Sequence, residues 1–205
     1  IIGFLVEIIA TGLGVILGGL SGYFGGWVDM IIMRIVDVFY CIPSMPLIII
    51  LGAVMDAMKV DPMLRMVYLM LILGFLGWPG IARLVRGQIL TIKENEYVLA
   101  ARAIGAKPGR IIWRHILPNC ISIIIISTAL EIPAAIFTES YLSFIGLGVA
   151  LPMPSLGSLA SDARSGLQSY PLKLVFPAIM IVLIVLAFNL LGDGLRDAFD
   201  PKLRK

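Results

Sequence analysis

The sequence predicts an all-α membrane protein, a polytopic bundle with about five spanning helices. Of its 205 residues, 60% are hydrophobic and only 14% are charged. The mean hydropathy is +1.01. Apolar runs recur along the chain, and several approach the roughly 20 residues that a helix needs to cross a bilayer. A soluble domain of this length would need far more polar surface, so we expect the helices to face lipid.

The first predicted span covers residues 1–20 and is interrupted by Glu7. Glycines then recur every four residues, at Gly14, Gly18, Gly22 and Gly26. This spacing places small residues on one helix face, where a second helix can approach closely. For Gly26, and for Gly25 beside it, we favour a turn between the first and second spans.

Two prolines, Pro43 and Pro46, interrupt the second apolar run. Proline removes a backbone donor and kinks a helix. Broken helices at membrane depth are tolerated where they line a cavity or are covered by protein. Residues 42–47 are therefore a candidate wall of a transport pathway, and simple kinked packing is an equal alternative.

Charged residues mark the inner ends of the second and third spans. Arg34 is expected to pair with Asp29 or Asp37 on one helix. The third run covers residues 64–81, and its cytoplasmic exit is marked by two basic residues, Arg83 and Arg86. Positive charge between two spans belongs in the cytoplasm.

A basic loop, residues 91–118, separates the third span from the fourth. Its cations are Lys93, Arg102, Lys107, Arg110 and Arg114. Residues 98–104 suit a short helix, with Thr91 and Glu94 as a capping box. Gly105 is expected to close that helix in the left-handed conformation. Pro108 suits the first turn of a second short helix, so we expect two short helices lying at the membrane surface.

The last part of the chain contains two more apolar runs, residues 118–137 and 172–191. Glu131 lies inside the first of them, at a depth where an ionisable group is expensive and commonly functional; a structural bond to neighbouring helices is the equal alternative. Between the runs, residues 139–173 are too rich in glycine, proline and serine for one helix and are expected to dip back into the bundle. The basic tail from Arg196 predicts a cytoplasmic C-terminus.

Within the basic loop, the pattern Ala100-Ala101-x-x-x-Gly105 followed by Leu117-Pro118 resembles the "EAA" loop of ATP-binding-cassette importer permeases. Two positions depart from the family pattern, because Leu99 replaces a glutamate and His115 replaces an isoleucine. The His-x-Leu-Pro-Asn ending, the earlier Gly-Tyr-Phe-Gly-Gly and the segment 139–148 resemble the C-type subunits that import dipeptides, oligopeptides and nickel.

This resemblance implies a type I importer transmembrane domain over residues 1–205, with residues 91–118 as its coupling loop. Such permeases usually have six spans, so the chain would hold the last five and be incomplete at its N-terminus. The implied ATPase-coupling residues are Leu99, Ala100, Ala101, Gly105, Ala106, His115, Leu117 and Pro118. Candidates for the pathway or for helix interfaces are Pro43, Pro46, Glu131, Pro133 and Glu139.

The implied partners are a homologous permease subunit, two ATP-binding-cassette ATPase subunits and an extracytoplasmic solute-binding protein, assembled in the lipid of a bacterial or archaeal cytoplasmic membrane. The chain has no GxxxxGK[ST] phosphate loop and is expected not to be an enzyme. It should carry no cofactor or metal of its own, with ATP and Mg²⁺ on the ATPase subunits. The net charge of +3 is concentrated in one loop and gives little reason to expect nucleic-acid binding.

Three alternatives remain open on the sequence alone. The basic loop suits a segment that merely lies on anionic lipid. A secondary transporter or channel driven by an ion gradient would be favoured by inverted repeats, and we find no such repeat. A structural membrane scaffold would leave the loop without a role. The sequence does not distinguish dipeptide, oligopeptide and nickel as the solute.

Overall fold

The computed structural model describes residues 2–149 and 153–199, and within these residues the ordered elements are all helical. The helices are α1 (Ile2–Phe24), α2 (Gly26–Cys41), α3 (Ser44–Ala57), α4 (Pro62–Ile92), α5 (Glu96–Ala103), α6 (Pro108–Ile111), α7 (Leu117–Phe144), α8 (Leu156–Ala163) and α9 (Leu172–Phe199). A π-helical segment (Ile112–Ile116) joins α6 to α7, and a 3₁₀ turn (Arg164–Gly166) follows α8. Four helices are long and apolar enough to cross a membrane, or five spans if the bent α2–α3 pair is counted as one. The predicted helical membrane bundle is confirmed.

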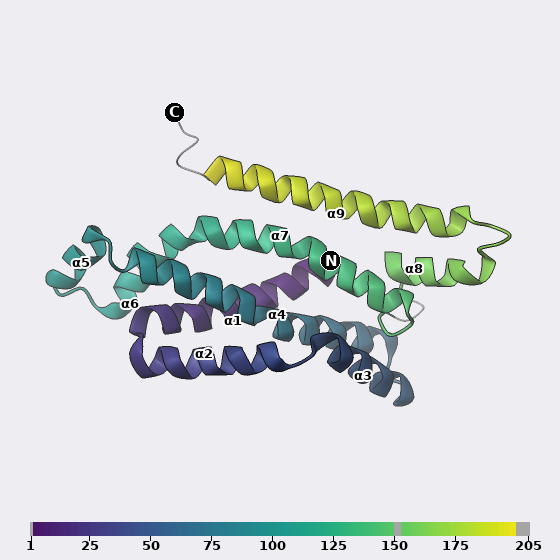
Figure 1. The fold of residues 1–205 in the computed structure, drawn as a ribbon, viewed down its shortest axis with the longest axis horizontal. Helices are drawn as coiled ribbons and strands as arrows, with labels where there is room; N and C mark the ends of the chain where they lie inside the picture. The colour runs from purple at the N-terminus through teal and green to yellow at the C-terminus, as the bar shows by residue number, and fades with distance from the viewer. Residues whose placement is uncertain (1, 150–152, 200–205) are drawn as a thin grey trace.

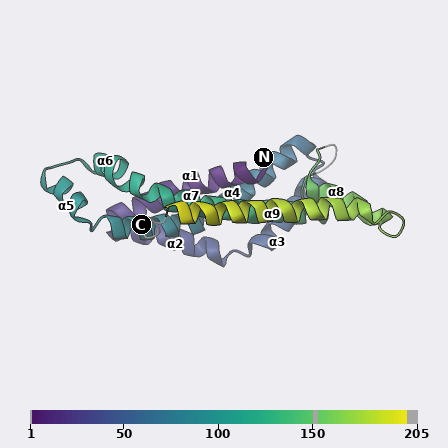
Figure 2. The same cartoon turned by 90° about the horizontal axis from the view of Figure 1, so that it is seen from above.

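The long helices run roughly along one axis and divide their connections between two ends of the bundle (Figures 1 and 2). The α1–α2 turn, α5, α6 and the end of α9 lie at one end. The α3–α4 turn and α8 lie at the other. This alternation follows the order of spans that the sequence predicts, and it gathers the basic loop at the end where α1 and α9 finish.

The core of the bundle is the close packing of α1 on α4. A side chain at Gly14 would meet the Cβ of Ile81 at 2.5 Å, and one at Gly22 would meet the Cβ of Ile89 at 2.9 Å. Gly18 lies between them, directly against the backbone of Ala82. The glycine face is confirmed for these three positions. Gly25 and Gly26 form the turn into α2, with φ of 65° and 51°.

The break in the second span lies between α2 and α3, whose axes differ by 71°. Ile42 and Pro43 adopt extended backbone conformations there, and the Ile42 N–H turns back to the Phe39 carbonyl. Pro46 does not contribute to the break as the sequence suggested. It lies in the first turn of α3, where the missing N–H would have no helical partner anyway.

Ion pairs join α2 to α4 more firmly than they join residues within α2. Asp29 accepts two hydrogen bonds from Arg86, at 2.5 and 2.6 Å, and does not pair with Arg34. Asp29 and Arg34 are five residues apart, which turns them about 140° from each other on a helix. Asp37 pairs with Arg34 at 3.6 Å and with Arg83 of α4 at 2.6 Å.

Helix α4 is longer than the predicted third span. The sequence placed the end of the third span at Ile81 because basic residues follow it. The helix continues past this point to Ile92, and Arg83 and Arg86 pair with carboxylates on α2. The expected capping box is absent, because Thr91 lies inside α4 and its hydroxyl donates to the Gly87 carbonyl. The last helix likewise continues past Leu191 to Phe199.

The segment after α7 packs onto the bundle, as predicted, but it begins later than expected. Helix α7 continues past Phe137 to Phe144, and Leu142 near its end is fully buried. The carbonyl of Gly146 accepts a hydrogen bond from Arg65 of α4 at 3.1 Å. Gly157 of α8 then lies against the backbone of Ser140. Helix α8 is thereby held between α7 and α9 (Figure 1).

Replacement of Arg86 by methionine is expected to lower the free energy of unfolding by about 1–3 kcal/mol, because the half-buried Asp29 loses its two charged donors. The change is checked by thermal unfolding of the purified protein in detergent. Arg34→Met is the matched control. Its side chain is 79% exposed, so the expected change is under about 0.5 kcal/mol. Equal losses in the two variants would contradict the structural role of the Asp29–Arg86 pair.

Candidate functional site

The first candidate site is the basic loop, where α5 projects from the end of the bundle (Figure 1). Its inner face is anchored by two buried residues, Val98 and Ala101, which belong to one apolar cluster with residues of α4 and α6. Its outer face is open. Leu99 on this face is 46% exposed, and Ile104, which follows the last residue of α5, is 85% exposed. An amphipathic helix fixed on one side and apolar on its free side is suited to receive another protein.

Gly105 closes α5 as the sequence predicts. Its φ is +79°. The Ala106 N–H donates to the Ala101 carbonyl and the Gly105 N–H donates to the Arg102 carbonyl. These two bonds form a Schellman motif, which satisfies carbonyls that the helix end would otherwise leave free. Pro108 then begins α6 at its first position, so the turn between the two helices is fixed by backbone chemistry at both ends.

The second helix of the loop does not lie apart at the membrane surface, which corrects the prediction. Helix α6 continues through the π-helical segment into α7, giving one helical stretch over Pro108–Phe144. The Leu117 N–H donates to the Ile112 carbonyl, five residues back. Pro118 explains the wider turn, because its ring would clash with a regular helical carbonyl. Asn119 donates its side-chain amide to the His115 carbonyl at 2.6 Å.

A hollow of about 440 Å³ lies between α5 and the start of α6–α7. Its lining comprises Tyr97, Ala100, Ala101, Ile104, Ala106, Arg110, Arg114 and His115. The structure therefore brings together four of the eight predicted coupling residues. Gly105 forms the turn beside the hollow, whereas Leu99, Leu117 and Pro118 lie outside its lining.

Four lining residues, Tyr97, Ile104, Arg110 and Arg114, were not among the predicted coupling residues. Tyr97 and Ile104 belong to the first short helix of the loop or its end. Their spacing from Ala100 and Ala101 is three or four residues, which places all four on one helix face. Helical periodicity within the loop would therefore have found them. The Tyr97 and His115 rings lie 6.4 Å apart and form one side of the hollow.

Two cations tie the basic loop to the end of α1. Lys93 donates to the Gly22 carbonyl at 3.3 Å, and a cation is favourable near the C-terminal end of a helix. The Arg102 guanidinium lies 5.6 Å from the centre of the Tyr23 ring. Movement of the basic loop would therefore act on α1 as well as on α4 and α7.

The second candidate site is an open cavity of about 230 Å³ between α1, α3, α4 and α7, and Glu131 on its wall is exposed. Glu131 lines it from α7, and Glu7 lines it from α1. Nothing in the sequence pattern predicted that these two carboxylates would share a cavity. Pro43 and Pro46 do not line the cavity, but the residues between them, Ser44 and Met45, do. Pro133 is buried inside α7 and contributes to packing.

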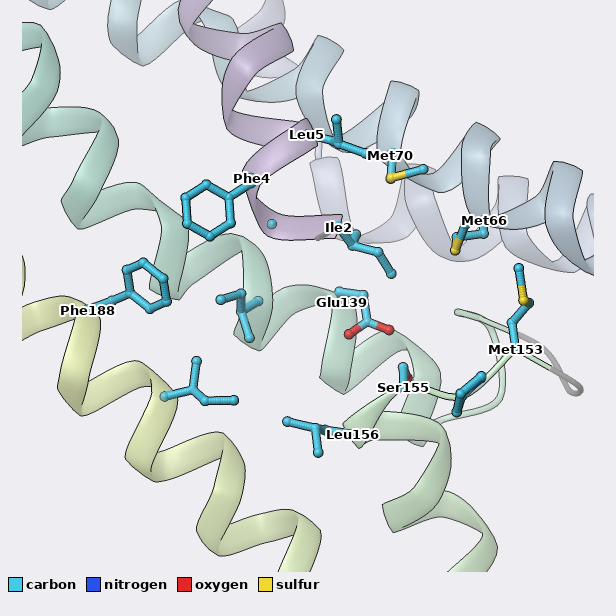
Figure 3. A pocket seen from close by; sticks show the side chains of 14 residues that line it. Ile2, Phe4, Leu5, Met66, Met70, Glu139, Met153, Ser155, Leu156 and Phe188 are labelled. Carbon is cyan, nitrogen blue, oxygen red and sulfur yellow. The ribbon is translucent and has the colours of Figure 1, made fainter.

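Glu139 lines a different and larger cavity, of about 670 Å³, between the start of α1, α4, α7 and α9 (Figure 3). Its carboxylate points into this cavity beside Ser155 and Leu156. It accepts a hydrogen bond from the Ser143 hydroxyl at 2.7 Å. The same hydroxyl accepts the Val149 N–H at 2.9 Å, so Glu139 holds the segment that follows α7. The assignment of all these residues to coupling or pathway roles stays a prediction.

A comparison with models of known protein families shows to which family the chain belongs. Residues 14–205 match the model of the "binding-protein-dependent transport system inner membrane component" family. The chain belongs to this family.

Proteins similar to this chain include permeases that are named for peptide transport. The chain is 43% identical over 204 residues to the oligopeptide transport system permease protein OppC of Bacillus subtilis, and 46% identical over 205 residues to the dipeptide transport system permease protein DppC of the same bacterium. It is 43% identical over 192 residues to the glutathione transport system permease protein GsiD of Pectobacterium atrosepticum.

The matches cover nearly the whole of this family member but only part of each relative. For OppC and DppC of B. subtilis they cover all of the chain and 65% and 62% of the relative. For GsiD they cover 94% of the chain and 62% of the relative. The resemblance to ATP-binding-cassette importer permeases of the peptide branch is thereby confirmed.

Proposed function

We propose that the chain is the transmembrane permease subunit of an ATP-driven importer of peptides. It is proposed to form the pathway with a homologous permease subunit, to couple to two ATPase subunits, and to receive solute from an extracytoplasmic binding protein. Family membership supports this assignment, and the names of the relatives support peptides as the solute. Nickel is not part of the proposal, because no relative described above is named for it.

The main structural support for the proposal is the way in which the basic loop packs against the bundle. Its inner side is locked to α4 and α7 through Val98, Ala101 and Ile111, whereas Leu99 on its outer side and Ile104 at its end remain exposed. A segment that only rests on lipid has no need of a rigid turn at Gly105 and a second anchor on α1. A partner bound on the outer side would instead move the helices with the loop.

The proposed orientation places the basic loop and the end of α9 in the cytoplasm. Five cations between Lys93 and Arg114 lie in the loop, and Arg196 lies in the last turn of α9. Cytoplasmic loops of membrane proteins carry such an excess of Lys and Arg. The ATPase subunits, which hold ATP and Mg²⁺ in this proposal, would then reach the loop from the side where ATP is available.

In the proposed mechanism, closure of the ATPase subunits around ATP displaces the basic loop as one body. The contacts at Val98, Lys93 and Ile111 pass this displacement to α4, α1 and α7. The bundle then exchanges an inward-open for an outward-open packing. ATP on one side and the loaded binding protein on the other shift the population between these two states.

The proposal is tested with the full-length protein, expressed with its partner subunits and reconstituted in proteoliposomes. We expect ATPase subunits to co-purify with it, and uptake of a labelled dipeptide to require both ATP inside and binding protein outside. A complex prepared with an ATPase subunit that cannot hydrolyse ATP is the control. Uptake that persists with that subunit and follows an imposed ion gradient would overturn the proposal in favour of secondary transport.

A further inference from the structure

The cavity between α1, α3, α4 and α7 is lined by two carboxyl groups, and one of them is buried without a hydrogen-bond partner. Glu7 is only 6% exposed, and its Oε2 atom is buried without a hydrogen-bond partner. Glu131 lines the same cavity from α7. Burying a carboxylate without partners is costly, and a second carboxylate nearby adds to the cost. A favourable ligand for this cavity is therefore one that brings positive charge.

The other residues that line the cavity indicate which kind of cation it would bind. Two hydroxyls, of Ser44 and Thr138, add oxygen acceptors, and the described residues of the wall include no Lys or Arg. Much of the rest is apolar, including Ile48 and Leu73. Calcium sites are built from several carboxylates and carbonyls that supply six to eight oxygen ligands, and no group of three or more acidic, His or Cys side chains among the described residues could hold a metal ion. A primary ammonium group has three donors and no acceptor, which matches two carboxylates and two hydroxyls.

The position and the volume of the cavity suit a site that binds one end of a transported solute. It lies beside the break between α2 and α3, where the first residues of α3 form part of its wall. Broken helices within membranes occur where they line a cavity or are covered by protein. Its volume of about 230 Å³ is below the roughly 300–1,000 Å³ of pockets that enclose a whole small molecule. It therefore suits one end of a larger solute.

We propose that Glu7 and Glu131 bind the primary ammonium group of the transported solute in this cavity. This inference rests on the proposed function, since it assigns the ammonium to a peptide N-terminus. Glu7 supplies the buried carboxylate, and Glu131 supplies the second from the facing helix. The two residues lie on α1 and α7, so the bound ammonium bridges helices that belong to the same moving bundle.

The test reads binding at Glu7 directly and does not depend on transport. The full permease–ATPase complex, without binding protein, is treated with a lipid-soluble carbodiimide, and modification of Glu7 is measured by mass spectrometry. We expect leucine methylamide, which has a free ammonium and no carboxylate, to protect Glu7. N-acetyl-leucine methylamide, which lacks the ammonium, should not protect it. Equal protection by the two probes, or a Glu7 that resists modification, would overturn the proposal.

Variants separate a binding role from a structural one. Glu131→Gln removes one charge-assisted hydrogen bond, so half-protection of Glu7 should need at least about tenfold more leucine methylamide. Asp197→Asn, which neutralises an exposed carboxylate on α9 outside the cavity, should leave the half-protection concentration unchanged. An unchanged value in Glu131→Gln would contradict the shared site. If leucine methylamide protects Glu7 but the complex shows no ATP-driven uptake, the proposed transport function is contradicted and the proposed binding site is not.

Discussion

Replacement of Gly18 by leucine is expected to lower the free energy of unfolding by about 3 kcal/mol and to separate α1 from α4. Gly18 lies against the backbone of Ala82, and even a Cβ at this position would come within 2.9 Å of the Ala82 Cα. A backbone cannot rotate away as a flexible side chain does, so one helix must move. The loss is measured by chemical unfolding of the purified protein in detergent, followed by tryptophan fluorescence.

Gly12→Leu is the matched control for this experiment. Gly12 lies in the same helix, and a Cβ added there would have no atom of a neighbouring element within 4 Å. Leucine is therefore expected to be tolerated at this position or to be slightly stabilising. A similar loss in both variants would mean that helix propensity or insertion, and not the α1–α4 contact, sets the stability of α1.

The features that the sequence predicted correctly are those decided by local chemistry. Pro43 lies at the break in the second span, where its ring removes one bond from the helical hydrogen-bond ladder. The glycine spacing in α1 predicts a close helix contact because the helical period alone places Gly14 and Gly18 on one face. Likewise, Gly105 and Pro108 define the turn in the basic loop through their own backbone preferences.

The features that the sequence did not predict depend on tertiary contacts. A run of apolar residues followed by Arg83 looks like the end of a span, whereas the helix continues to Ile92 and its arginines pair with carboxylates of α2. The cavity shared by Glu7 and Glu131 requires α1 and α7 to meet, although the two residues are far apart in the chain. Such juxtapositions follow from packing, which one sequence without its relatives does not specify.

Replacement of Gly105 by valine is expected to reduce ATP-driven uptake by about tenfold. The φ of Gly105 is +79°, a conformation that costs a residue with a side chain about 1–2 kcal/mol and is a marked outlier for a β-branched residue. The Schellman bonds of Ala106 and Gly105 would open, and α5 would lose its fixed angle to α6. A change of about 1.4 kcal/mol in the docked population corresponds to tenfold. Uptake in proteoliposomes and binding-protein-stimulated ATPase activity are the measurements.

Two further variants show whether the backbone or the bulk of the side chain matters. Asparagine is similar in size to valine but adopts the left-handed conformation readily, so Gly105→Asn should retain most of the uptake. Gly109→Val places the same side chain four residues further on, in α6, where an added Cβ would meet no neighbouring atom within 4 Å, and should also retain uptake. If Gly105→Asn fails as completely as Gly105→Val, side-chain bulk at the partner surface is the cause. If Gly105→Val transports normally, the rigid turn is not needed and the proposed lever is wrong.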